Sequence, residues 1–112
     1  PGYLEFSQQM AYWALTLNKT GDPSAALEYV KKLKARSDTT TTGQEEYNLG
    51  RYYGGIGEID SAFFWLEKAF DKKSPEMPWL RVDPTLKNLR RDEQYLDLYR
   101  RTGHGAYDQY RK

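Results

Sequence analysis

The sequence predicts an all-α protein in which a helical hairpin is repeated. Apolar residues recur at the spacing of amphipathic helices in several segments, and helix start and stop signals flank these segments. Two stretches of the chain also match each other when the sequence is shifted by 36 residues, which places Ala14 on Gly50. No segment shows the alternation of polar and apolar residues that is typical of a β-strand.

The first two helices are expected over residues 3–19 and 23–36. The first ends at Thr20-Gly21, and the second begins with Asp22 as N-cap and Pro23 in the first helical position, where a missing N–H costs nothing. The apolar positions are Leu4, Met10, Trp13, Ala14 and Leu17 in the first helix and Ala26, Leu27, Val30 and Leu33 in the second. The basic residues of the second helix, Lys31, Lys32, Lys34 and Arg36, are expected on its solvated face.

A third and a fourth helix are expected over residues 43–54 and 58–71. Thr42 followed by Glu45 predicts a capping box at the start of the third helix. Three glycines, Gly54, Gly55 and Gly57, are expected to form the turn to the fourth helix. The apolar residues of the fourth helix are Ala62, Phe63, Leu66, Ala69 and Phe70.

The remainder of the chain predicts two short helices and a polar tail. Pro75 and Pro78 cannot extend the fourth helix, so that it stops near residue 72. Asp83-Pro84 repeats the start signal of Asp22-Pro23, and Asp92 is expected to cap a last helix that Gly103 closes. Residues 104–112 form the tail, which contains His104, Tyr107 and Tyr110.

Length and composition indicate one small domain, residues 1–112, and exclude several classes of function. The net charge of +1 argues against a nucleic-acid partner, which usually requires a marked basic excess. No apolar stretch is long enough to cross a membrane, so no membrane partner is expected. The absence of cysteine fits a reducing compartment, and a cytoplasmic location is expected. Because the chain starts at Pro1 and not at methionine, we expect it to be an excised domain or a processed product.

The matched positions of the two stretches agree in size or chemistry. They pair Ala14 with Gly50, Leu17 with Tyr53, Gly21 with Gly57, Ala26 with Ala62, Val30 with Leu66, and Leu33 with Ala69. Small residues at these places would let two helices cross closely. This interpretation assigns the glycine cluster to a turn between helices and not to a phosphate-binding loop, because no Gly-Lys-Ser/Thr ending follows and no strand precedes it.

This pattern resembles the tetratricopeptide repeat (TPR), a helical hairpin of about 34 residues. Residues 43–76 carry it as Leu49-Gly50, Tyr53, Gly57, Ala62, Leu66 and Ala69, with Pro75 one place late. Residues 7–40 carry it more loosely as Trp13-Ala14, Leu17, Gly21, Ala26 and Val30, with Leu33 in place of an alanine and Asp38 in place of a proline. The resemblance implies an α-α superhelix of two repeats.

Residues 79–95 are similar to the segment that closes many bacterial TPR arrays in winged-helix regulators, adenylate-cyclase-like proteins and kinase-linked sensors. The matching residues are Trp79, Leu80, Arg81, Asp83, Pro84, Leu89, Arg90 and Asp92, whereas Glu93 and Tyr95 depart from that pattern. The resemblance implies that the helices of about 79–103 cap the second repeat, with Trp79, Leu86, Leu89, Tyr95, Leu96 and Tyr99 covering it, and that the parent is a bacterial regulatory protein.

The resemblance also implies a binding groove lined by the first helix of each repeat. Its positions fall on Gln8, Ala11, Tyr12, Leu15 and Asn18, and on Gln44, Tyr47, Asn48 and Arg51. Tyr and Arg anchor interfaces and amides bond a peptide backbone, so partial exposure of Tyr12, Tyr47, Asn48 and Arg51 is expected. The alternative is that these positions pack against a neighbouring repeat or the C-terminal helices. The carboxylate clamp of one TPR subfamily retains only Asn48 here.

No residue set suggests catalysis, a cofactor or a metal. His104 stands between two glycines as the sole histidine, and Glu45-Glu46 and Asp92-Glu93 suit first helical turns better than acid–base work. We therefore expect a non-enzymatic interaction scaffold that binds another protein, a peptide or a neighbouring domain of its own chain. The alternative is a structural cap or a self-association domain, with a weak homodimer as one form.

Overall fold

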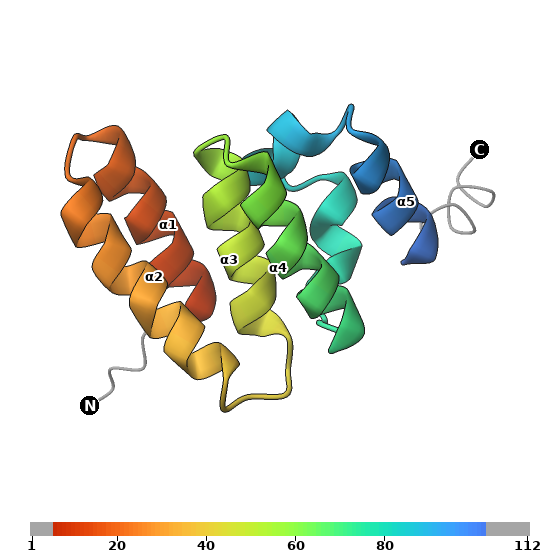
Figure 1. Ribbon diagram of the computed structural model, residues 1–112, viewed down its shortest axis with the longest axis horizontal. Helices are drawn as coiled ribbons and strands as arrows, with labels where there is room; N and C mark the ends of the chain where they lie inside the picture. The colour runs from red at the N-terminus through yellow and green to blue at the C-terminus, as the bar shows by residue number, and fades with distance from the viewer. Residues whose placement is uncertain (1–5, 103–112) are drawn as a thin grey trace.

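The computed structural model describes residues 6–102, which form an all-α protein without a strand in that range (Figure 1). Four α-helices come first, and two short 3-10 helices, η1 and η2, and a last α-helix follow. The elements are α1 (Ser7–Lys19), α2 (Pro23–Ser37), α3 (Gln44–Gly55), α4 (Ile59–Asp71), η1 (Met77–Arg81), η2 (Pro84–Leu89) and α5 (Glu93–Arg101). The predicted fold class and the four main helices are therefore confirmed.

The four main helices form two hairpins that stand side by side, with the C-terminal helices at the far end (Figure 1). Helix α3 is the centre of this arrangement. It contacts both α1 and α2 of the first hairpin, α4 of its own hairpin, and η2. The matched positions take the same packing role in both hairpins, because Ala14, Ala26, Val30 and Leu33 are buried as are their counterparts in the second hairpin.

The close helix crossing expected at Gly50 is confirmed. A Cβ atom at Gly50 would lie 2.6 Å from Leu66 Cδ2 and 2.7 Å from Leu66 Cγ of α4. Gly57 supplies the turn with φ of +84°, a conformation that favours glycine. The assignment of all three glycines to the turn is wrong, however. Gly54 and Gly55 belong to the last turn of α3, where Gly54 approaches η2 and Gly55 approaches Leu15 of α1.

Three of the predicted helix starts are confirmed, at Asp22, Asp83 and Asp92, and one is displaced. The Asp22 side chain accepts a hydrogen bond from the N–H of Ala25 at 3.1 Å, and the Asp92 side chain accepts one from the N–H of Gln94 at 2.8 Å. The capping box at Thr42 is wrong, because the N-cap of α3 is Gly43 with φ of +79°. Glycine is needed there, since a Cβ atom would lie 2.8 Å from the Cβ of Ser74.

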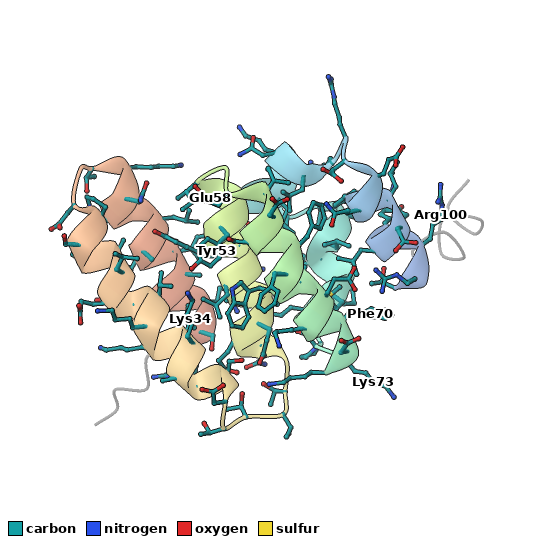
Figure 2. All side chains as sticks on the ribbon, in the orientation of Figure 1. Lys34, Tyr53, Glu58, Phe70, Lys73 and Arg100 are labelled. Carbon is teal, nitrogen blue, oxygen red and sulfur yellow. The ribbon has the colours of Figure 1, made fainter. Side chains whose placement is uncertain are left out.

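The hydrophobic core consists of two clusters that meet at Tyr53. One lies between α1, α2 and α3, and the other lies between α3, α4 and the C-terminal segment. Figure 2 shows Tyr53 near Lys34 of α2, whose ammonium lies 5.5 Å from the centre of the Tyr53 ring. Each hairpin is thus covered by its neighbour and cannot bury its apolar residues alone.

The C-terminal segment covers the second hairpin with only part of the expected set. Leu86, Leu89 and Tyr95 are buried, and Tyr99 is partly buried against the same cluster. Trp79 and Leu96 do not contribute, because 56% and 44% of their surfaces are exposed. The remaining buried places go to Met77, Leu80 and Leu98, which were not in the set expected to cover the second repeat.

Leu27, the segment around Pro78 and the two ends of the chain were the subject of further predictions. Leu27, expected on the apolar face of α2, is 48% exposed. The 3-10 helix η1 was not expected, because Pro78 argues against a helix at this place. It forms because a proline is tolerated in the first turn of a helix, where Pro78 lies. Gly103, His104 and the rest of the tail, 104–112, lie outside the described residues, as does Leu4. Within residues 6–102, no helix combines the length and apolar character that a membrane span requires.

Candidate functional site

The expected exposure of the second-repeat groove residues is wrong. Tyr47 and Asn48 have no exposed surface, and Arg51 is 5% exposed. They lie on the face of α3 that the C-terminal segment covers, as the alternative interpretation of these positions required. A partner peptide therefore cannot reach Tyr47 or Asn48 in this structure, whereas Gln44 at the start of α3 is exposed.

Two carboxylates from the C-terminal segment take the place that was expected for a ligand. Asp83 accepts a hydrogen bond from Tyr47 Oη at 3.0 Å and one from Arg51 Nε at 2.6 Å. Glu76 accepts one from Arg51 Nη1 at 3.0 Å and one from Asn48 Nδ2 at 3.0 Å. Arg51 also donates to Asn48 Oδ1 at 2.8 Å, so that the five side chains form one buried polar network.

The electrostatics of this network follow from burial and from the single cation at its centre. Burial raises the pKa of Asp83, but hydrogen bonds from Thr85 and Arg51 and the charge of Arg51 outweigh it, so the pKa of Asp83 is lowered. Burial dominates at Glu76 and raises its pKa despite Arg51. Burial and the charge of Asp83 together raise the pKa of Tyr47. Asp83 is therefore the firmly ionised partner of Arg51.

A second set of buried carboxylates fixes α3 against the first hairpin. Glu45 accepts hydrogen bonds from Ser7 Oγ of α1 at 2.9 Å and from Thr40 Oγ1 at 2.8 Å. Glu46 is fully buried and bonds Ser37 of α2 and Lys72 after α4. The two residues were interpreted as helix-dipole acids, but their main contacts are with other elements. They hold the two hairpins in a fixed relative position.

A surface groove remains between α1 and the C-terminal segment. Three adjoining depressions of about 310, 270 and 360 Å³ follow α1 from Ser7 to Lys19. The first two share Gln8 and Trp79, and the last two share Tyr12 and Pro84. One wall therefore comes from α1, and the other comes from the segment that begins at Glu76 and includes η1 and η2.

The sequence-predicted residues of the first repeat divide between this groove and the core. Gln8 is exposed, and Tyr12 is 38% exposed with its ring 5.7 Å from the guanidinium of Arg51. Leu15 is 7% exposed and borders the groove near Gly55. Ala11 is buried, and Asn18 approaches Tyr52 Oη at 3.5 Å instead of facing a ligand. Arg51 forms part of the groove floor.

The residues of the opposite wall were not predicted to be functional. Trp79 and Val82 are each 56% exposed and line the groove together with Pro84. Trp79 was expected to cap the second repeat and Asp83-Pro84 was expected to start a helix. Only the second expectation is correct, because the Asp83 side chain accepts a hydrogen bond from the N–H of Thr85 at 3.0 Å. A usable signal existed in Arg51, since a basic residue on a helix face that becomes buried requires a carboxylate partner elsewhere in the chain.

Comparison of this chain with protein-family models, with curated proteins and with solved structures yields no significant match.

Proposed function

We propose that this protein is a non-catalytic interaction module that binds a peptide segment of another protein in the groove between α1 and the η1–η2 segment. The TPR-like sequence pattern supports a helical repeat whose first helices face the ligand. The proposed module consists of two repeats and a C-terminal cap, and it belongs to a larger cytoplasmic regulatory protein. Because the groove lies beside the capping segment, the ligand would contact both the repeat and its cap.

The observation that carries the proposal is the pair of half-exposed aromatic side chains on opposite walls of the groove. Tyr12 comes from α1 and Trp79 from η1, and both line the depression whose floor includes Arg51. Aromatic residues that remain partly exposed above a rigid floor are typical anchors of an interface. The buried network holds the floor and the Trp79 wall in place, so that a ligand would meet a preformed surface.

The dimensions of the groove favour a short ligand. Helix α1 has 13 residues, which corresponds to a length of about 20 Å at 1.5 Å per residue. An extended peptide rises about 3.3 Å per residue, so that roughly six residues would fill the groove. The exposed amides of Gln8 and Gln44 are placed to bond the backbone of such a peptide.

The experiment is selection of peptides by the purified domain from a random displayed library, followed by affinity measurements on selected peptides. Tyr12→Ala and Trp79→Ala should each weaken binding at least about fivefold, which corresponds to about 1 kcal/mol. Phe64→Ala is the matched control, because Phe64 of α4 has the same exposed fraction as Trp79, 56%, and lies outside the groove. Selected peptides that bind all three variants like the wild type would overturn the proposal.

The alternative function is a self-association surface without a peptide ligand. Its support is the set of large apolar side chains exposed outside the groove, Trp13, Leu27, Phe64 and Leu96. Sedimentation of the domain over a range of concentrations distinguishes the two. A concentration-dependent dimer that Phe64→Ala or Trp13→Ala abolishes would support self-association, whereas a monomer at all concentrations would argue against it.

A further inference from the structure

The groove has an electrostatic direction along α1. The depression at the C-terminal end of α1 is lined by two basic residues, Lys19 and Lys87, and by no acidic residue within residues 6–102. Lys19 comes from the last turn of α1 and Lys87 from η2, so that the two ammonium groups belong to opposite walls. Both side chains are exposed.

The charges in the rest of the groove do not balance this basic end. The middle depression is bordered by Glu76 and Asp83, but both carboxylates are bonded to Arg51 within the floor. Among the described residues that line the depression at the N-terminal end, Glu76 carries the only charge, and Phe6 and Trp79 lie beside it. In the part of the chain that the structure describes, the basic end of the groove therefore has no carboxylate facing its lysines. Exposed aromatic surface lies in the middle and at the other end.

We propose that the ligand of this groove is an acidic peptide segment, with an apolar side chain seated between Tyr12 and Trp79 and one or two carboxylates near Lys19 and Lys87. This inference rests on the proposed peptide-binding function and adds the chemical class of the peptide and its register. Complementary charge selects among peptides that all fit the apolar part, because a like charge at the basic end would be repelled.

The spacing between the apolar and the acidic residue of the peptide follows from the distance between Tyr12 and Lys19 along α1. Tyr12 and Lys19 are separated by seven positions, which span about 10 Å along α1 at 1.5 Å per residue. An extended peptide covers about 10 Å in three residues. An apolar residue followed three or four positions away by an acidic residue therefore matches both parts of the groove.

The test uses two matched series of fluorescein-labelled peptides of the form acetyl-Gly-Xaa-Ser-Gly-Glu-Glu and acetyl-Gly-Xaa-Ser-Gly-Gln-Gln, with Phe, Leu or Trp as Xaa. Fluorescence polarisation should show the Glu-Glu series binding about three- to tenfold more tightly than the Gln-Gln series at low salt, as expected for two solvent-exposed charge contacts. The difference should shrink as salt screens the charges. The Lys19→Gln/Lys87→Gln double variant should bind both series alike.

Lys31→Gln is the matched control, because Lys31 is an exposed lysine of α2 that lines none of the three depressions. It should leave the preference for Glu-Glu unchanged. Equal binding of both series to the wild type, with binding still lost in Tyr12→Ala, would overturn the acidic preference and leave the groove function standing. Absence of binding by both series and by library-selected peptides would overturn both. A preference that Lys31→Gln reduces as much as the double variant would also overturn the assignment to Lys19 and Lys87.

Discussion

Asp83→Asn should destabilise the protein strongly although the substitution preserves shape. The Asp83 carboxylate accepts four hydrogen bonds, from Tyr47 Oη, Arg51 Nε, Thr85 N and Thr85 Oγ1, at 2.6–3.0 Å. An asparagine amide can keep the two bonds from Thr85 with its oxygen, but it then presents its NH₂ group to the Nε–H of Arg51. A buried guanidinium donor is left facing another donor.

The magnitude follows from the burial of both partners. Side-chain exposure is 6% for Arg51 and 1% for Asp83, and removal of one partner from a buried ion pair costs about 3–5 kcal/mol. We expect about 3 kcal/mol, the lower end, because Arg51 retains Glu76 and Asn48. For a domain of this size the melting temperature should fall by at least about 10 °C.

The assay is urea unfolding followed by far-ultraviolet circular dichroism at neutral pH and fixed ionic strength. Asp71→Asn is the matched control, because Asp71 is exposed at the end of α4, and it should change the free energy of unfolding by no more than about 0.5 kcal/mol. A double-mutant cycle with Arg51→Met should give a coupling energy of about 1–3 kcal/mol. A loss below about 1 kcal/mol for Asp83→Asn, or additive effects in the cycle, would refute the proposed structural role of the network.

Three further predictions concern pH, packing and the cap. Folding lowers the pKa of Asp83 below its ordinary value near 4. The stabilising contribution of its carboxylate is therefore present above that value and is lost as pH falls through the folded pKa. In urea titrations, the stability difference between the wild type and Asp83→Asn should shrink below about pH 4. Gly50→Ala should lower the free energy of unfolding by about 1–3 kcal/mol, because the added Cβ atom clashes with Leu66. In a Leu66→Ala background this loss should vanish. An unchanged free energy of unfolding in the wild-type background would contradict the close helix crossing. A chain ending before Trp79 should unfold without cooperativity or aggregate, because α3 loses its contacts with Asp83 and Leu86 and the second core cluster loses Leu80. An unchanged melting temperature would exclude the capping role.

The helical architecture could be predicted because its signals are local. Asp22-Pro23 and Asp92 act on the N–H groups of the next few residues, and their capping bonds occur as expected. The offset of 36 residues placed small residues where helices cross, and Gly50 meets Leu66 there. These features depend on spacing within one or two turns or on the repetition of one hairpin, so that neighbouring residues alone define them.

The candidate site could be predicted only in part, because a groove position is defined by what covers it. The shift of 36 residues places Tyr12 on Asn48, yet Tyr12 is 38% exposed and Asn48 is buried. The difference arises because the C-terminal segment packs on α3 and leaves α1 open on that side. Trp79 shows the converse, since an apolar residue expected in the core forms a wall of the groove.

The sequence by itself determined that the described part of the chain is all-α, the approximate location of its main helices, and that two hairpins pack in the same way. Only the tertiary structure decided that Arg51 is neutralised from within by Glu76 and Asp83, carboxylates 25 and 32 residues away along the chain. Local patterns fix backbone conformation through hydrogen bonds between near neighbours. The partner of a buried charge depends instead on which distant segments the whole fold brings together. The position of the open groove depends on the same packing, because the segment that supplies Glu76 and Asp83 also forms one wall of the groove.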